Sequence, residues 1–94
     1  MKLKVTIRVI NPVRTGVSQS TGRAWKSQDV VVAWTEKLVD GRDYENIQLV
    51  SMRGDQVDRF AAIGAQVGRV LDVDLAFSTR TYNGKVYNEN VMFI

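Results

Sequence analysis

A basic and aromatic stretch near the amino end, RTGVSQSTGRAWKSQ, contains residue types suited to holding a charged, planar ligand. Its middle part, Thr15 to Arg23, has Val17 as its one large apolar side chain and should project into water as a flexible loop. Arginine forks onto phosphate oxygens, and a tryptophan ring stacks on a nucleic-acid base for about 1–3 kcal/mol. The stretch predicts a nucleic-acid contact made by Arg14, Arg23, Trp25 and Lys26. The alternative is a solvated hairpin whose charges serve only solubility.

A second cluster lies around Asn83-Gly84, the strongest hairpin signal in the chain, because both residues tolerate the positive φ of a type I′ turn. A two-residue turn pairs Tyr82 with Lys85 and Arg80 with Tyr87. Alternation then places these four side chains on one face of a protruding ribbon. We expect two aromatic rings and two cations to meet a ligand there.

The opposite face of this hairpin carries Phe77, Thr79 and Val86, which the pattern assigns to the core. Asn88 and Asn90 would face inward with them if alternation continued. We therefore expect a β-bulge at these asparagines before the last strand.

Strands must position both clusters. The first, Lys2 to Ile10, alternates strictly, with a basic outer face and an apolar inner face of Leu3, Val5, Ile7 and Val9. Pro12 ends it, since proline cannot donate to the ladder.

The second strand begins near Ala24 and runs to about Thr35. Period two places Val30, Val32 and Trp34 in the core and points Trp25, Ser27 and Asp29 outward. Trp34 is therefore predicted to be structural and Trp25 to lie at the surface.

A third strand, Tyr44 to Met52, is followed by a short helix. Asp55 is expected to cap its free amides and Gly64 to end it in the left-handed conformation. The buried face of the helix should carry Val57, Phe60 and Ala61, which fall at i, i+3 and i+4.

The fourth strand, Arg69 to Thr79, has an inner face of Leu71, Val73, Leu75 and Phe77. Asp72 and Asp74 share its outer face and could form half of a Mg²⁺ site. Without a third ligand nearby, a solvated face is the better interpretation.

Three strands, a short helix and two further strands, with long first and last hairpins, predict an all-β fold in one domain, residues 1–94. This order is that of the five-stranded Greek-key barrel called the OB-fold, with the helix between strands three and four. An SH3-like barrel is the alternative, although it would not need that helix.

Composition limits the chemistry available to these 94 residues. The chain contains no cysteine and no histidine, which removes disulfides, thiolate zinc sites, the commonest metal ligands and the commonest general base near neutral pH. We expect a protein that is not an enzyme and that holds no metal or cofactor.

Charge is divided unevenly along the chain. Residues 1–28 hold six basic and no acidic residues, whereas residues 29–94 hold seven basic and ten acidic ones. This uneven distribution of charge suits a protein that presents one side to a polyanion. The apolar runs are too short for a membrane span and the amino end lacks a signal-peptide core, so we expect a soluble, cytoplasmic protein.

Three segments together carry a family resemblance: GVSQSTGRAWKSQDVVVAW, SMRGDQVDRFAAIGAQVGRVLDVDL and RTYNGKVYNENVMFI. They resemble the small single-domain OB-fold single-stranded-DNA-binding proteins of bacteria, plasmids and phages. The resemblance implies sequence-independent binding of single strands, in replication or recombination, through the first and last hairpins and the outer face of strands one to three. Mapped by residue, it points to Arg14, Arg23, Trp25, Lys26, Arg80, Tyr82, Lys85 and Tyr87.

Two further expectations concern the partners of the protein. A single barrel binds few nucleotides, so a homodimer or homotetramer is expected. Because the chain ends at Val91 to Ile94, recruitment of repair enzymes by an acidic tail is expected to be absent. Two alternatives stay open: an OB module that binds RNA, and a protein-interaction module of a replication or phage assembly.

Overall fold

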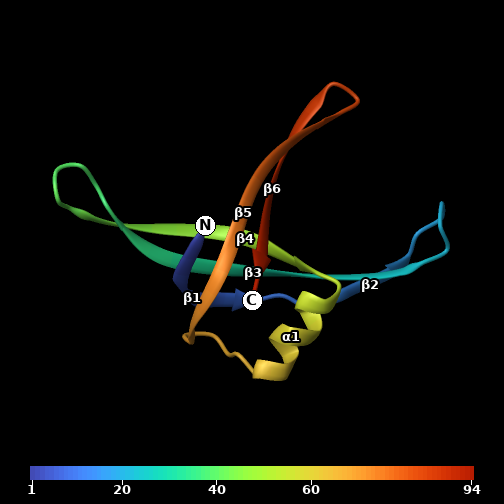
Figure 1. Ribbon diagram of the computed structural model, residues 1–94, viewed down its shortest axis with the longest axis horizontal. Coiled ribbons are helices and arrows are strands. Elements are labelled where there is room, and N and C mark those ends of the chain that lie inside the picture. The colour runs from blue at the N-terminus through green and yellow to red at the C-terminus, as the bar shows by residue number, and fades with distance from the viewer.

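The computed structural model describes residues 1–94, except for the side chain of Arg80. Strands dominate the chain, and one helix interrupts them (Figure 1). In chain order the elements are β1 (Lys2–Ile10), β2 (Arg14–Val17), β3 (Ala24–Lys37), β4 (Asp43–Arg53), α1 (Asp55–Ile63), β5 (Val70–Tyr82) and β6 (Lys85–Phe93).

The strands close into a barrel. The sheet order is β1-β5-β6-β4-β3-β2, and β1 also pairs with β3, so β1, β3, β4, β5 and β6 form a closed ring. Neighbours are antiparallel except for β4 and β6, which meet in parallel at Ser51 and Val91. The expected OB-fold barrel, with its helix between the third and fourth long strands, is confirmed. The additional strand, β2, is a short edge strand paired with the start of β3.

The core is a single cluster drawn from the inner faces of the five barrel strands. Val30, Val32 and Trp34 are buried as the alternation predicts, and the Trp34 Nε1–H donates to Glu36 Oε1 at 2.8 Å. From α1, Val57 and Phe60 pack into the same cluster. The fold therefore rests on alternation along the strands and one amphipathic turn of helix.

One residue of β1 departs from its predicted face. The β1–β3 register shifts between Ile7 and Val9, so a β-bulge interrupts the alternation. Val9 consequently lies at the surface, 45% exposed, and Ile10 packs against the core instead. The prediction that Val9 is an inner residue is wrong.

The ends of α1 differ in how well the sequence predicted them. Gly64 ends the helix in the left-handed conformation, as predicted. At the start, however, Gly54 is the N-cap with φ 58°, no side chain caps the amides, and Asp55 is already helical, so the predicted aspartate cap is wrong. Ala61 is exposed, and Ile63 packs against the core in its place.

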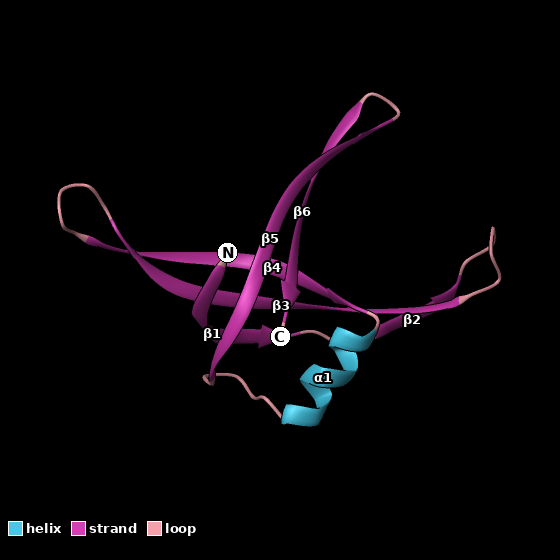
Figure 2. Cartoon of the chain, viewed as in Figure 1, coloured by secondary structure: helices cyan, strands magenta, loops and turns pink.

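The β5–β6 hairpin rises out of the barrel instead of covering it (Figure 2). Phe77 is 49% exposed and Val86 67% exposed, and Thr79 is exposed as well, because no strand faces this part of the ribbon. The assignment of these residues to the core is wrong.

The hairpin register also runs without a break from Asp74–Phe93 to Tyr82–Lys85, so the predicted bulge at the asparagines is absent. Asn90 does face inward, and its Nδ2 group donates to Leu49 O at 3.3 Å. An amide is accommodated there because the backbone of β4 supplies its acceptor.

Substitution of Trp34 tests the inner face of β3. Because Trp34 is 8% exposed and packed in the core, we expect Trp34→Ala to lower the free energy of unfolding by about 3–5 kcal/mol. The exposed Trp25→Ala should cost less than about 1 kcal/mol. Urea unfolding followed by far-ultraviolet circular dichroism compares the two variants, and the reverse ranking would contradict this strand register.

Candidate nucleic-acid interface

The first predicted loop is partly a strand. Residues of β2 pair with Ala24–Ser27 of β3, and Gly16 lies directly opposite Trp25. Only the segment after Val17 forms a turn. Two hydrogen bonds close this turn, from Ser18 N to Arg23 O (2.9 Å) and from Gly22 N to Ser18 O (2.8 Å). The basic stretch is thus a structured hairpin that extends from the barrel (Figure 1).

Trp25 lies on the outer face of this hairpin, as predicted, and is 48% exposed. Its indole packs against Gly16: a Cβ added there would lie 2.5 Å from Cζ2 of the ring. The same ring lines a groove together with Thr15, Val17 and Arg53. A glycine opposite the ring therefore lets the indole lie close to the backbone while it stays open to a ligand.

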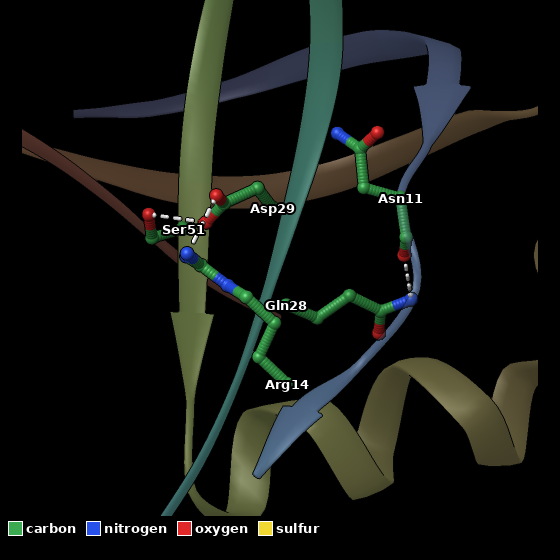
Figure 3. A network of polar contacts seen from close by, with 5 residues as sticks. All are labelled: Asn11, Arg14, Gln28, Asp29 and Ser51. Carbon is green, nitrogen blue, oxygen red and sulfur yellow. Dashed lines mark hydrogen bonds and ion pairs between the residues drawn. The ribbon is translucent and has the colours of Figure 1, made fainter.

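Two of the predicted phosphate ligands have acidic partners. The Arg14 Nη2 donates to Asp29 Oδ2 at 2.9 Å, and the other carboxylate oxygen accepts from Ser51 Oγ at 2.8 Å (Figure 3). Lys26 forms an ion pair with Asp58 of α1. Arg23, in contrast, makes no ion pair with any residue that the structure describes.

The same network fixes the connection that precedes β2. The buried Gln28 side chain donates from Nε2 to Asn11 O at 3.0 Å (Figure 3), and Asn11 N donates to Asp29 O at 3.1 Å. Arg14 is therefore both a cation at the site and one of the contacts that hold the hairpin on β3.

The second predicted cluster has the predicted geometry in its backbone. Tyr82 pairs with Lys85, and position 80 pairs with Tyr87, around a turn with positive φ at Asn83 and Gly84. Tyr82 is 66% and Tyr87 45% exposed. The side chain of Arg80 lies outside the described part of the chain.

A groove at the base of this hairpin brings the two clusters together. It is lined by Tyr87 and by the outer face of β4, including Leu49, Ser51 and Arg53. Arg53 lines this groove and also the groove of Trp25, and it lies opposite Ser27 on β3. Trp25 and Tyr87 are thus connected by one basic residue, while Tyr82 and Lys85 stand at the tip beyond the groove.

Arg53 is a residue of the candidate site that the sequence did not indicate. It forms an ion pair with Glu89 at 3.3 Å and remains 55% exposed. Continuing the alternation of β4 by one position past Met52 would have placed it on the outer face. Because Arg53 directly precedes the Gly-Asp pair that predicts the helix, the sequence pattern there indicates a helix start and not a binding residue.

Apolar side chains extend the same outer face away from Arg53. Val9, Val31 and Leu49 form one row across β1, β3 and β4, and Ile47 follows on β4. Ile47 is 54% and Leu49 55% exposed. Flat apolar surface next to exposed aromatic rings suits the faces of unpaired bases.

The acidic face of β5 offers no comparable site. Asp72 and Asp74 lie opposite Lys4 and Lys2 of β1, and the hydrogen bond from the amino-terminal ammonium lowers the pKa of Asp74 below its ordinary value. Within the described residues, no three acidic side chains lie close enough to hold a metal ion. No described helix is long and apolar enough to cross a membrane.

Comparison with known proteins adds no relative: no protein-family model matches the chain, and no curated protein matches it.

Gly16→Ala tests the support of Trp25. The added methyl group overlaps the indole, so the ring must leave its place on β2 and become more exposed. In a Trp34→Phe background, where Trp25 is the sole tryptophan, we expect a red-shifted emission and stronger quenching by acrylamide. The Trp34→Phe protein without the alanine is the control, and identical emission and quenching would show that the ring does not rest on Gly16.

Proposed function

We propose that this protein binds single-stranded DNA without regard to base sequence, as an OB-fold protein that coats and protects exposed strands in replication or recombination. The observation that carries the proposal is the continuity of the outer face: Trp25 and Tyr87, each about half exposed, lie on two grooves that share Arg53. Stacking on exposed rings does not depend on base identity, and Arg53 between the rings carries the charge that a phosphate of the strand requires.

Unpaired bases explain the preference for single strands. In a duplex the base faces are stacked on each other, and neither Trp25 nor Tyr87 could reach them without unstacking. A flexible single strand can turn its bases toward the rings and the apolar row of Val31 and Leu49 while its phosphates face Arg53. We propose no catalytic step, because the chain contains neither histidine nor cysteine.

The cations fall into two groups. Arg23 and Lys85 are exposed and available to phosphate directly, whereas Arg14, Lys26 and Arg53 must exchange a carboxylate for a phosphate. The Lys26–Asp58 pair is exposed on both sides and contributes only about 0–1 kcal/mol, so its exchange costs little, whereas the carboxylates of Asp29 and Glu89 are only 22% and 20% exposed. RNA offers the same phosphates and base faces, and binding of RNA is the second candidate. Cytoplasmic location and assembly into a homodimer or homotetramer belong to this proposal as well.

Titration of oligo(dT) while tryptophan emission is recorded tests the proposal. We expect quenching that weakens with salt, and no quenching by a duplex of equal length. Trp25→Ala should weaken binding by about 1–3 kcal/mol, since one stacking platform is lost. Arg23→Ala should reduce the slope of log K against log salt by about 0.7, the value for one phosphate contact with a single strand.

Controls separate the alternatives in the same assay. Arg42→Ala removes an exposed cation from the β3–β4 loop, which lines neither groove, and should leave the slope unchanged. Equal affinity for oligo(U) would extend the activity to RNA. No response to either single strand would contradict the proposal and favour a protein-interaction role for the aromatic hairpin.

Asp58→Asn tests the exchange of carboxylate for phosphate. Loss of the Asp58 charge frees Lys26, so we expect tighter binding of oligo(dT) at low salt and a salt slope steeper by up to about 0.7. Asp72→Asn makes the same change in net charge on β5 and is the matched control. If both variants gained affinity equally, net charge and not the release of Lys26 would be responsible.

A further inference from the structure

The β5–β6 hairpin ends in a turn formed by Asn83 and Gly84, which stands clear of the barrel (Figure 2). Both residues are exposed and have positive φ, 50° for Asn83 and 75° for Gly84. Asn83 is the one non-glycine residue with positive φ in the described part of the chain. The core cluster contains no residue of this turn, so the turn can change conformation without moving the core.

The two groups that could react with each other at this turn have no partner among the described residues. The side-chain amide of Asn83 makes no hydrogen bond there, and the backbone N–H of Gly84 donates none. Glycine has no Cβ, so no side chain crowds its nitrogen. An amide carbon and a backbone nitrogen that can attack it are thus adjacent and exposed to water.

The turn is one peptide rotation away from the reactive geometry. A five-membered ring between Gly84 N and Asn83 Cγ forms when ψ of Asn83 is about −120°, the value at the first central residue of a type II′ turn. That residue also has φ of about +60°, and φ of Asn83 is already 50°. Rotation of the peptide plane between the two residues therefore converts the present turn into the reactive one. Both turns suit a two-residue hairpin, although a side chain makes the second a minor state.

The other four asparagines of the chain lack this arrangement. Asn11 precedes Pro12, which has no N–H and cannot close the ring in this way. Three asparagines lie in strands, where ψ of about +135° keeps the following nitrogen away from the side chain. These three also hydrogen-bond through their side-chain amides: Asn46, Asn88 and Asn90.

We propose that Asn83 is a site of spontaneous deamidation. The nitrogen of Gly84 forms a bond to Asn83 Cγ, the bond from Cγ to the side-chain nitrogen breaks, and the proton from Gly84 leaves with that nitrogen as ammonia. Water then opens the resulting succinimide. Attack at the side-chain carbonyl gives aspartate, and attack at the backbone carbonyl gives isoaspartate, in which the main chain runs through the former side chain.

The product places a carboxylate at the tip of the hairpin, beside Tyr82 and Lys85. The carboxylate would compete with phosphate for Lys85, and isoaspartate adds a methylene group to the main chain and so disturbs the pairing of Tyr82 with Lys85. Ageing should therefore weaken binding of a polyanion at this hairpin. This consequence rests on the proposed function, whereas the deamidation itself does not.

Peptide mapping by mass spectrometry after prolonged incubation tests the reaction. We expect ammonia to be lost and one oxygen gained from water at Asn83, faster at mildly alkaline than at neutral pH, because the attacking nitrogen must lose its proton. In ¹⁸O-labelled water the product should carry the label. Both aspartate and isoaspartate should appear.

The asparagines in the strands are internal controls in the same digest. Asn88 and Asn90 should stay unmodified while Asn83 reacts. Reaction at Asn83 no faster than at Asn88 or Asn90 would overturn the inference. Aspartate without isoaspartate would also overturn it, because direct hydrolysis by water needs no attack by Gly84.

Asn83→Asp reproduces one product and tests the consequence. We expect affinity for oligo(dT) at low salt to fall by up to about fivefold, the value of one exposed ion pair, and the salt slope to fall by about 0.7. Gln66→Glu makes the same change in net charge at an exposed position between α1 and β5 and is the matched control.

The outcomes separate this inference from the proposed function. Equal losses for Asn83→Asp and Gln66→Glu, or no loss for Asn83→Asp, would overturn the effect of the modification on binding. Failure of the fresh wild-type protein to bind oligo(dT) would overturn the proposed function, and deamidation at Asn83 would still be decided by the peptide map.

Discussion

The pairing of β3 with three other strands is the constraint on which the rest of the structure depends. Its middle closes the barrel against β1, its residues 27–37 pair with β4, and its start pairs with β2. Alternation along this one strand buries Val32 and Trp34 and presents Trp25 to solvent. The core and the candidate interface therefore share a single register, and a slip by one residue would destroy both.

Three of the cations around the candidate interface are paired with carboxylates before any ligand binds. Asp29 meets Arg14, Asp58 meets Lys26, and Arg53 meets Glu89. Such pairs hold long side chains near the groove and reduce the repulsion between neighbouring cations. A polyanion would replace several such partners at once, which makes binding sensitive to salt.

Sequence reasoning succeeded where a regular strand packs on the core, and where turn chemistry sets the register of a hairpin. The inner residues of β3, the OB-fold order and the register around Asn83-Gly84 could all be predicted from period two and turn chemistry. It failed at Val9, where a bulge shifts the register, and at Phe77, where the ribbon leaves the barrel and has no strand to face. The sequence pattern of one strand shows neither a bulge nor whether another strand packs over it, because both depend on the neighbouring strands.

The candidate site was predictable as two clusters but not as one surface. Composition and spacing indicated Trp25 and Tyr87 separately, whereas their connection through Arg53 depends on how β4 passes between two hairpins. The role of Arg53 in this connection follows from the pairing of Ser27 with Arg53, a tertiary contact that the sequence alone does not give.

Because the hairpins extend beyond the barrel, their length can change without changing the stability of the core. The core cluster contains no residue of the β5–β6 tip or of the β3–β4 loop, so lengthening or shortening either ribbon would leave the buried surface intact. A loop that changes by a few residues costs only a small closure entropy. The reach of each hairpin and the attachment of labels could therefore be altered at these tips by mutation, while the barrel that holds them stays constant.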